Sequence, residues 1–165
     1  LGIVDKDWVE KEFRLQFEFF EDIGLKPSHV DSHYNIHAFS PITEIAVRLA
    51  KEYKVEKMRW PKERLEGLPR SLVALKALIV SKKLKDCPLV APDHHFGFVH
   101  RGDPQIERFL SYLDFEGSAE LGVHVSSSRL NPIDRKYYDK ELQVLLHHRF
   151  KEGLKRVELI SYNEL

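Results

Sequence analysis

The sequence predicts an α/β fold in which helices cover a parallel sheet, and three observations support this prediction. Segments with helical apolar spacing alternate strictly with short β-type runs, which is the pattern of βαβ units. The composition is that of a folded domain, with 42% hydrophobic and 32% charged residues. The 165 residues hold about five such units, fewer than a complete (βα)₈ barrel of about 250 residues needs.

The individual elements follow from the spacing of apolar residues. Helices are expected where apolar residues recur every three or four positions, at 7–23, 41–53, 69–84, 104–113 and 133–150. Strands are expected in the β-type runs at 28–31, 55–60, 88–92, 118–125 and 156–162. Because each strand except the last is followed by a helix, the strands are expected to run parallel.

Three helix starts are expected from capping residues. The segment 5–7, D-K-D, is interpreted as the cap of the first helix. Ser40 and Asp103 each supply a side-chain acceptor at an expected N-cap. The prolines that follow them, Pro41 and Pro104, have no backbone donor to lose at the first helical position.

The overall composition excludes several classes of partner. Lysine plus arginine and aspartate plus glutamate are equal at 26 each, so no net charge attracts the chain to nucleic acid or an anionic membrane. The single cysteine, Cys87, cannot form an internal disulfide and is expected to be a packed thiol. No stretch approaches the ~20 continuous apolar residues of a membrane span. We therefore expect a cytoplasmic protein that recognises its partners at a local site, and a homodimer is left open.

Side chains that can bind a metal or transfer a proton gather where the expected strands end. The first strand runs into 29–37, H-V-D-S-H-Y-N-I-H, and the second ends at Arg59. The third ends at 93–98, D-H-H-F-G-F, and the fourth ends on His124. Six of the nine histidines fall in these segments. Since reactive groups of parallel α/β folds collect at the strand ends, we expect a functional site at this edge.

The segment 29–37 has the side chains of a metal or proton-transfer centre. His29, Asp31 and His33 alternate, so on an extended segment they point to one face. His37 comes four residues after His33 and could share its face if the chain turns helical. Neutral imidazole and carboxylate together suit a metal such as zinc. The sequence therefore predicts such a centre near Asp31 and His33.

Each of these residues also has a purely structural interpretation. The segment 29–37 could be a polar loop that caps the next helix, and Arg59 could simply pair with a carboxylate. His124, at the end of an apolar strand, is equally consistent with a satisfied core histidine. No function is assigned to three further histidines, His100, His147 and His148. The first of these is expected at the surface, and the other two are expected as cations near a helix C-terminus.

The segment 27–37, P-S-H-V-D-S-H-Y-N-I-H, resembles the P-x-H-x-D-S-H-x-x-x-H signature of the YdjC-like (ChbG-type) carbohydrate deacetylases. Later features agree in order: Arg59, F-G-F at 96–98, E-L-G-V-H at 120–124 and E-L-I-S-Y at 158–162. The resemblance covers essentially the whole chain. It implies a distorted (βα) barrel of the glycoside hydrolase/deacetylase type, present as an incomplete set of about five βα units. It also implies that residues 1–165 are a single domain from the C-terminal part of a larger deacetylase.

The resemblance implies a metal-dependent hydrolase that removes an N-acetyl group from a sugar or a short oligosaccharide such as a chitooligosaccharide. In that family pattern His33 would be a metal ligand, Asp31 a catalytic carboxylate, and His124 the histidine that acts on the leaving amine. The residues implied for the surrounding shell or for substrate binding are His29, His37 and Arg59. The implied cofactor is a divalent metal, Mg or Zn, and the implied partner is a small-molecule carbohydrate.

Two features of the sequence depart from the family pattern. Val125 and Ser126 stand where Pro-Gly usually follows the late histidine. The paired aspartates and the G-x-H-L segment that supply the family's remaining metal ligands and its base do not occur. We therefore expect the 165 residues alone to bind metal poorly.

Two alternative functions stay open on the sequence. One is a non-catalytic carbohydrate-binding or interaction module with Trp60, Tyr34 and Phe98 as stacking surfaces. The other is a different metal-dependent hydrolase, such as an amidohydrolase. Asn35 stands where such enzymes have the second histidine of an H-x-H pair, but His37 keeps this possibility open.

Overall fold

The structure is a computed structural model that describes residues 5–63, 79, 82–97, 100, 104–124 and 132–165. The chain divides into two compact units, and each is described separately. The first comprises Leu1–Trp60, Leu84–Ala91 and Ser161–Leu165. The second comprises Pro61–Lys83 and Pro92–Ile160. The helix expected at 69–84 lies largely outside the described residues.

Helix α1 (Lys6–Asp22) begins where its capping residue predicts. The Asp5 carboxylate accepts hydrogen bonds from the backbone N–H groups of Asp7 and Trp8, both at 3.1 Å. These bonds satisfy two of the donors that the first turn of a helix leaves without an intrahelical partner. The cap expected at 5–7 is confirmed.

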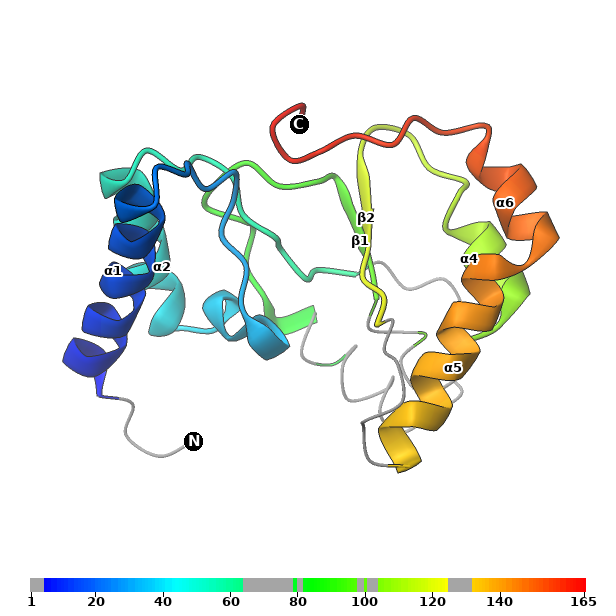
Figure 1. Ribbon diagram of the computed structural model, residues 1–165, viewed down its shortest axis with the longest axis horizontal. Helices are drawn as coiled ribbons and strands as arrows, with labels where there is room; N and C mark the ends of the chain where they lie inside the picture. Colours follow the sequence, from blue (N-terminus) through cyan, green and yellow to red (C-terminus); the bar gives the residue numbers. More distant parts are fainter. Residues whose placement is uncertain (1–4, 64–78, 80–81, 98–99, 101–103, 125–131) are drawn as a thin grey trace. The chain divides into compact units, whose positions relative to one another are not determined.

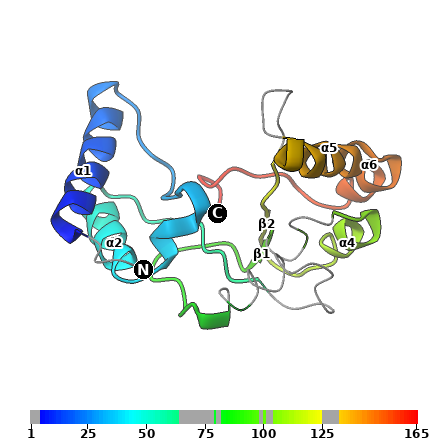
Figure 2. The ribbon, with the colours of Figure 1, turned by 90° about the horizontal axis from the view of Figure 1, so that it is seen from below.

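Helix α2 (Ile42–Glu52) lies beside α1 and runs in the same direction, as Figures 1 and 2 show. Two guanidinium–carboxylate pairs join the helices, Arg48 Nη1 to Glu10 Oε1 at 2.8 Å and Arg14 Nη2 to Glu52 Oε2 at 2.9 Å. Each pair spans 38 residues of sequence, so the contacts advance together along both helices. This parallel arrangement is typical of helices in successive βα units.

The start of α2 differs from the prediction. Pro41 occupies the N-cap and no side chain caps the helix, so the cap expected from Ser40 is wrong. The first free donors are satisfied by the chain itself, because the Phe39 carbonyl accepts from the N–H groups of Ile42 at 2.8 Å and Thr43 at 3.2 Å.

Strand pairing in the first unit is parallel but brief. Val30 forms a parallel bridge with Met58, and Lys57 forms a parallel bridge with Val90. The strands expected at 28–31, 55–60 and 88–92 are therefore represented by isolated bridges, in their sequence order and with the expected direction.

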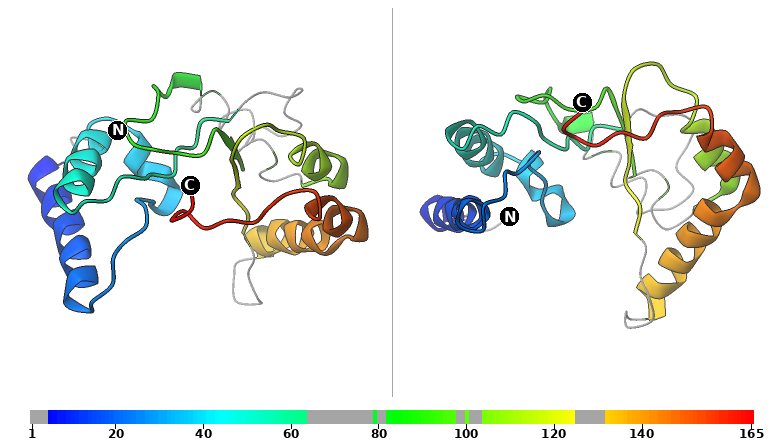
Figure 3. Two further views of the ribbon diagram at one scale, coloured as in Figure 1. Left: turned by 90° about the horizontal axis from the view of Figure 1, so that it is seen from above. Right: turned by 45° about the horizontal axis from the view of Figure 1, so that its top comes forward.

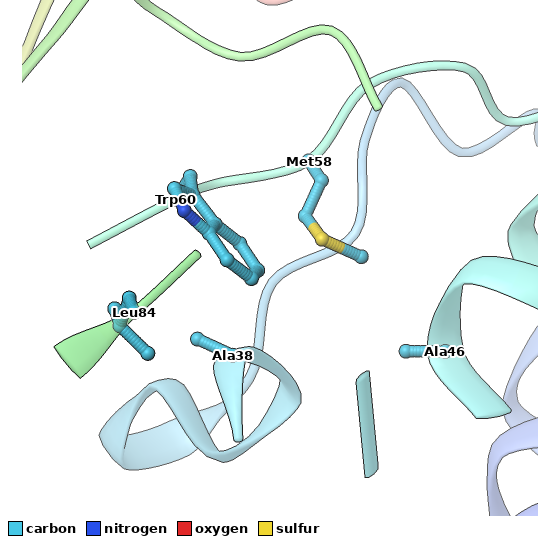
Figure 4. Packing of buried hydrophobic residues seen from close by; sticks show 5 residues of the cluster. All are labelled: Ala38, Ala46, Met58, Trp60 and Leu84. Atoms are coloured by element: carbon cyan, nitrogen blue, oxygen red, sulfur yellow. The ribbon is translucent and has the colours of Figure 1, made fainter. Parts of the chain in front are cut away.

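A small hydrophobic core lies under these bridges, and Figure 4 shows five of its residues together, Ala38, Ala46, Met58, Trp60 and Leu84. The Trp60 ring is buried, and its indole N–H donates to the carbonyl of Lys85 at 2.8 Å. Cys87 packs against the same core, as expected, and burial raises the pKa of its thiol.

In the described part of the second unit, strands β1 (His94–Phe96) and β2 (Ala119–Leu121) pair in parallel. Strand β1 begins after the run expected at 88–92, whereas β2 lies inside the run expected at 118–125. Helices α4 (Ile106–Ser111) and α5 (Pro132–Leu146) both contact α6 (His148–Leu154), as Figures 1 and 3 show. The core of this unit consists of Phe96, Phe109, Tyr112, Val144 and Phe150.

Several expectations for the second unit are wrong in detail. The helix expected at 133–150 is interrupted at His147, whose Nδ1 accepts from the N–H of Arg149 at 3.2 Å and so caps α6. His147 and His148 therefore follow the C-terminus of α5, as expected, and also form the N-terminus of α6. Helix α4 starts at Ile106 without a side-chain cap, and Asp103, the expected cap, lies outside the described residues.

The prediction of a closing strand at 156–162 is also wrong, because the structure has no strand there. Residues 158–160 are irregular, and a turn follows them. Leu159 is 80% exposed, so its apolar side chain covers no sheet. The carbonyls of Tyr162 and Asn163 accept hydrogen bonds from the Lys57 ammonium, at 2.6 and 3.1 Å, in place of a β-ladder.

Among the residues that the structure describes, no helix is both long and apolar enough to cross a membrane. The cytoplasmic location and the homodimer considered above stay predictions.

Candidate functional site

The segment that follows the first bridge carries a strained turn. After Ser32 the chain enters a short 3₁₀ helix, η1 (His33–Ala38). Tyr34 and Asn35 have φ angles of 56° and 53°, in the left-handed region. Each such non-glycine residue costs about 1–3 kcal/mol, and strain of this kind concentrates at functional sites. The strain lies directly after His33, in the motif where the sequence predicts a site.

His37 is fully buried and holds this turn in place. Its Nε2 lies 2.7 Å from the backbone carbonyl of Arg59, which can only accept, so Nε2 carries the proton. Its Nδ1 then accepts from the Ser32 hydroxyl at 2.7 Å, and the same hydroxyl oxygen accepts from the His37 backbone N–H at 3.0 Å. Both ring nitrogens are therefore engaged by the protein, which gives His37 a structural role in this geometry.

Asp31 and Arg59 form an ion pair across the first two strand ends. Arg59 Nη1 donates to Asp31 Oδ2 at 2.6 Å, and the Ser32 backbone N–H donates to Asp31 Oδ1 at 2.7 Å. Each carboxylate oxygen keeps a further lone pair, so Asp31 can still accept a proton or a substrate hydrogen bond. The side chain of Asp31 is 33% exposed, which keeps it accessible to such a group.

His29 is held by ring stacking as well as by hydrogen bonding. Its ring lies parallel to that of Tyr162, with centroids 3.7 Å apart and an interplanar angle of 7°. Its Nδ1 lies 2.8 Å from the Ser28 hydroxyl. Because Lys57 binds the carbonyl of Tyr162, the C-terminal turn is fastened over His29.

His33 differs from the other two histidines of the motif because it is exposed. Its ring meets that of Tyr34 edge-on, with the ring centroids 4.1 Å apart. No described residue forms a hydrogen bond with its ring nitrogens. His33, Asp31 and His29 line one pocket of about 350 Å³. The same pocket is lined by an aromatic wall of α1 residues, Phe13, Phe17 and Phe20.

The sequence predicted a helix at 7–23 but did not identify this aromatic wall. Helix α1 buries none of its residues completely, and Phe20 is 40% exposed. The sequence offered one signal, the apolar face of an amphipathic helix. Periodicity alone does not distinguish a face that packs in the core from one that lines a pocket.

The motif fits one metal ligand but not a complete metal centre. Among the described residues, no group of three or more histidine, cysteine, aspartate or glutamate side chains is placed to hold a metal ion. His37 is committed at both nitrogens and Asp31 is paired with Arg59. His33 is thus the imidazole of the motif best placed to act as a ligand.

The second unit contains His124, which follows β2 and packs by its ring on Tyr138 with centroids 5.2 Å apart. Its backbone N–H donates to Oε2 of Glu141 at 2.6 Å, and its Nδ1 lies 3.4 Å from the same oxygen. Glu141 belongs to α5 and is 1% exposed, whereas the His124 side chain is 40% exposed. Glu141 was not singled out by the sequence, since nothing local connects it to a histidine 17 positions earlier.

His100 lies on the other side of the same carboxylate. It is fully buried, which contradicts the expected surface position, and its Nε2 is 3.7 Å from Glu141 Oε1. The rings of Phe109 and Tyr112 lie 4.7 and 5.8 Å from its own. Burial in these apolar surroundings lowers the pKa of His100 to about 4, so the ring is neutral at pH 7.

The entrance to β1 forms a second hollow, of about 640 Å³, lined by residues that include His94 and Asp93. The Asp93 carboxylate accepts from the backbone N–H of Ser118 at 2.8 Å and from its hydroxyl at 2.9 Å. These bonds hold the pKa of Asp93 below its usual value. His94 Nε2 bonds the carbonyl of Glu116 at 3.1 Å, and His95 is buried, so this segment ties β1 to the loop before β2.

Comparison with known protein families agrees with the sequence motifs. The model of the YdjC-like protein family matches residues 2–156, which include the 29–37 motif and His124. The chain belongs to the YdjC-like protein family. The resemblance that the motifs indicate is therefore confirmed, and the YdjC-like match favours this family over the amidohydrolase alternative.

Curated relatives of this YdjC-like chain carry the name carbohydrate deacetylase. The protein from Oceanobacillus iheyensis is 53% identical over 47 residues, 28% of this chain and 20% of the relative. The one from Brevibacillus brevis is 43% identical over 53 residues, 32% of this chain and 21% of the relative. The one from Clostridium beijerinckii is 41% identical over 44 residues, 27% of this chain and 18% of the relative. The aligned part of the chain thus spans about a fifth of the length of these relatives.

Proposed function

We propose that this chain acts in a carbohydrate deacetylase, an enzyme that hydrolyses the amide bond of an N-acetylated sugar such as a chitooligosaccharide. The observation that carries the proposal is the pocket that Asp31 and His33 line together with the aromatic wall of α1. Aromatic rings bind the apolar faces of sugars, while the polar side chains supply proton transfer or ligation. The names of the curated relatives support the same activity.

In this proposal Asp31 accepts a proton from the attacking water. The two remaining lone pairs on its carboxylate are available for this, and Arg59 keeps the carboxylate oriented. Addition of the oxygen to the acetyl carbon gives a tetrahedral intermediate, and its collapse breaks the C–N bond. His124 passes a proton to the departing nitrogen, so that acetate and a free amine are the products.

We also propose that His33 contributes one ligand to a divalent metal, Mg or Zn. A bound metal of this kind supplies Lewis acidity toward the amide carbonyl and increases the acidity of a bound water. The family resemblance and the exposed imidazole support this role, and the remaining ligands would come from outside the described residues. His29, fastened by Tyr162, would shape the pocket beside it.

We propose, finally, that both units belong to one barrel of βα repeats. The parallel bridges that link Val30, Met58 and Val90 in chain order, and the parallel pairing of β1 with β2, support this arrangement. Successive parallel neighbours are what a (βα) barrel requires.

The test is acetate release from N,N′-diacetylchitobiose by the longer deacetylase of which this chain is proposed to be a part, measured with chelator, with added Mg²⁺ and with added Zn²⁺. We expect metal-dependent release that His33→Ala abolishes. His148→Ala is the matched control, because His148 is an exposed histidine on α6, away from the motif in sequence. Absence of metal-dependent release, together with no effect of His33→Ala, would contradict the proposal.

The non-catalytic alternative makes a different prediction for the same protein. It requires saturable sugar binding that chelator does not change, with no acetate released. The structure removes one of its expected stacking surfaces, because Trp60 is only 7% exposed and belongs to the core. Tyr34 is 65% exposed, and Phe98 lies outside the described residues.

A further inference from the structure

A buried carboxylate touches His124 at two points. Glu141 Oε2 accepts the His124 backbone N–H at 2.6 Å and lies 3.4 Å from the ring Nδ1. The first contact fixes where the backbone of His124 lies, and the second faces one edge of its ring. Together they restrict both the position and the rotation of the imidazole.

The two ring nitrogens of His124 have different surroundings. Nδ1 is buried and forms no hydrogen bond with any described residue, although Glu141 Oε2 lies 3.4 Å away. The side chain is nevertheless 40% exposed, so its accessible area belongs to other ring atoms. Nε2 is therefore the nitrogen left to meet a reactant, and Nδ1 faces the carboxylate. Catalytic hydrogen bonds are often long or poorly aligned in free enzymes and tighten when the substrate binds.

Among the described residues, no charged partner of the carboxylate lies on its other side. Within the described residues its further polar neighbour is Nε2 of His100, at 3.7 Å. Burial keeps His100 neutral at pH 7, so that ring does not offset a negative charge. A buried carboxylate with no cation beside it is costly, and protonation of His124 would offset that cost.

We propose that Glu141 is the positioning residue for His124: it holds Nδ1–H toward its carboxylate and leaves Nε2 to carry the proton that His124 transfers. The proposal rests on the general-acid role of His124 proposed above. In the neutral ring, the single proton is then on Nδ1. In the imidazolium, which carries a second proton on Nε2, the carboxylate stabilises the positive charge until the Nε2 proton is transferred. A carboxylate that orients a histidine in this way selects the ring tautomer as well as its direction.

The first measurement uses the unaltered protein and requires no activity. Long-range ¹H–¹⁵N NMR of histidine-labelled protein reports which ring nitrogen of His124 carries the proton when the ring is neutral. We expect the Nδ1–H form. Observation of the Nε2–H form would overturn the proposal, whatever the enzymatic activity proves to be.

The second measurement uses Glu141→Gln, which keeps the size of the side chain and removes its charge. The amide can donate to Nδ1, so we expect the Nε2–H form of His124 and a fall in kcat of about 10²-fold with little change in KM. Glu141→Asp retains a carboxylate and should restore part of kcat. Glu152→Gln, an exposed glutamate paired with Lys155, is the matched control and should keep the parental kcat.

The outcomes separate this inference from the proposed function. If the unaltered protein releases no acetate, the proposed function fails and the tautomer measurement alone decides the role of Glu141. If the protein is active and Glu141→Gln keeps its kcat and its pH profile, the positioning role is wrong. If Glu141→Gln does not fold, the tautomer in the unaltered protein and the kcat of Glu141→Asp decide.

Discussion

The Nε2–H of His37 donates a hydrogen bond to the carbonyl oxygen of Arg59 at 2.7 Å. This bond joins the 3₁₀ helix after the first strand end to the second strand end. The Arg59 side chain returns from there to the carboxylate of Asp31 at 2.6 Å. Two strand ends are thus linked by a closed set of polar contacts, and the direction of Asp31 depends on a histidine that is itself inaccessible.

Replacing this histidine should destabilise the protein. His37→Phe keeps a buried ring but leaves the Ser32 hydroxyl and the Arg59 carbonyl without their partner. We expect the free energy of unfolding to fall by about 2–4 kcal/mol in urea denaturation. Ser32→Ala, which removes only one partner of the ring, should cost less. Equal stability of His37→Phe and the parent would contradict the role given to this bond.

The buried His100 predicts an acid-sensitive fold. Its pKa is about 4 in the folded state, mainly through burial, against 6.5 ordinarily. The nearby groups are the Glu141 carboxylate, which opposes the shift, and three cationic or titratable side chains that add to it, His124, Arg108 and His95.

Between these two pH values the unfolded chain binds the extra proton and the folded chain does not. Stability therefore falls as the pH drops from 6.5 toward 4, by up to about 3 kcal/mol from this one residue. Urea denaturation at several pH values should show that His100→Phe reduces this dependence. His148→Phe, which alters an exposed histidine, should leave it as in the parent. An unchanged slope in His100→Phe would show that other groups cause the acid sensitivity.

Gly117 should not tolerate a side chain. Its φ is 86°, and a Cβ atom there would lie 2.4 Å from Oδ2 of Asp93, the carboxylate that ties β1 to Ser118. We expect Gly117→Ala to lower the free energy of unfolding by about 1–3 kcal/mol, measured by thermal or urea denaturation. Gly24→Ala is the informative comparison, because its φ of 71° is also positive but no atom lies within 4 Å of the added Cβ. If both variants lose the same stability, backbone strain alone explains the effect and the contact with Asp93 adds nothing.

Lys57 should control the order of the C-terminal turn. Its ammonium binds the carbonyls of Tyr162 and Asn163, and Tyr162 stacks on His29. In Lys57→Met we expect amide hydrogen exchange of 161–164 to accelerate about tenfold or more, since charged hydrogen bonds of this kind are lost. Lys155→Met, which removes an exposed pair with Glu152, should leave that exchange unchanged. Unchanged exchange in Lys57→Met would mean that ring stacking suffices to hold the turn.

Local sequence signals predicted local structure well where a single side chain was sufficient. Asp5 caps α1 as expected, because the capping carboxylate needs only the backbone donors of the next three residues. Ser40 does not cap α2, because the Phe39 carbonyl already satisfies those donors. The alternation of helices and strands correctly predicted parallel pairing, since a crossover helix imposes that direction.

The sequence by itself determined the family, the parallel α/β organisation and the motif on which the site is built, because these depend on residue order and spacing. The tertiary structure alone decided the use of each histidine. His33 is exposed in the pocket, His37 is buried and hydrogen-bonds the Arg59 carbonyl, and His100 is a neutral core residue. Only the fold brings Glu141 against His124, because protonation and orientation depend on burial and on partners distant in sequence.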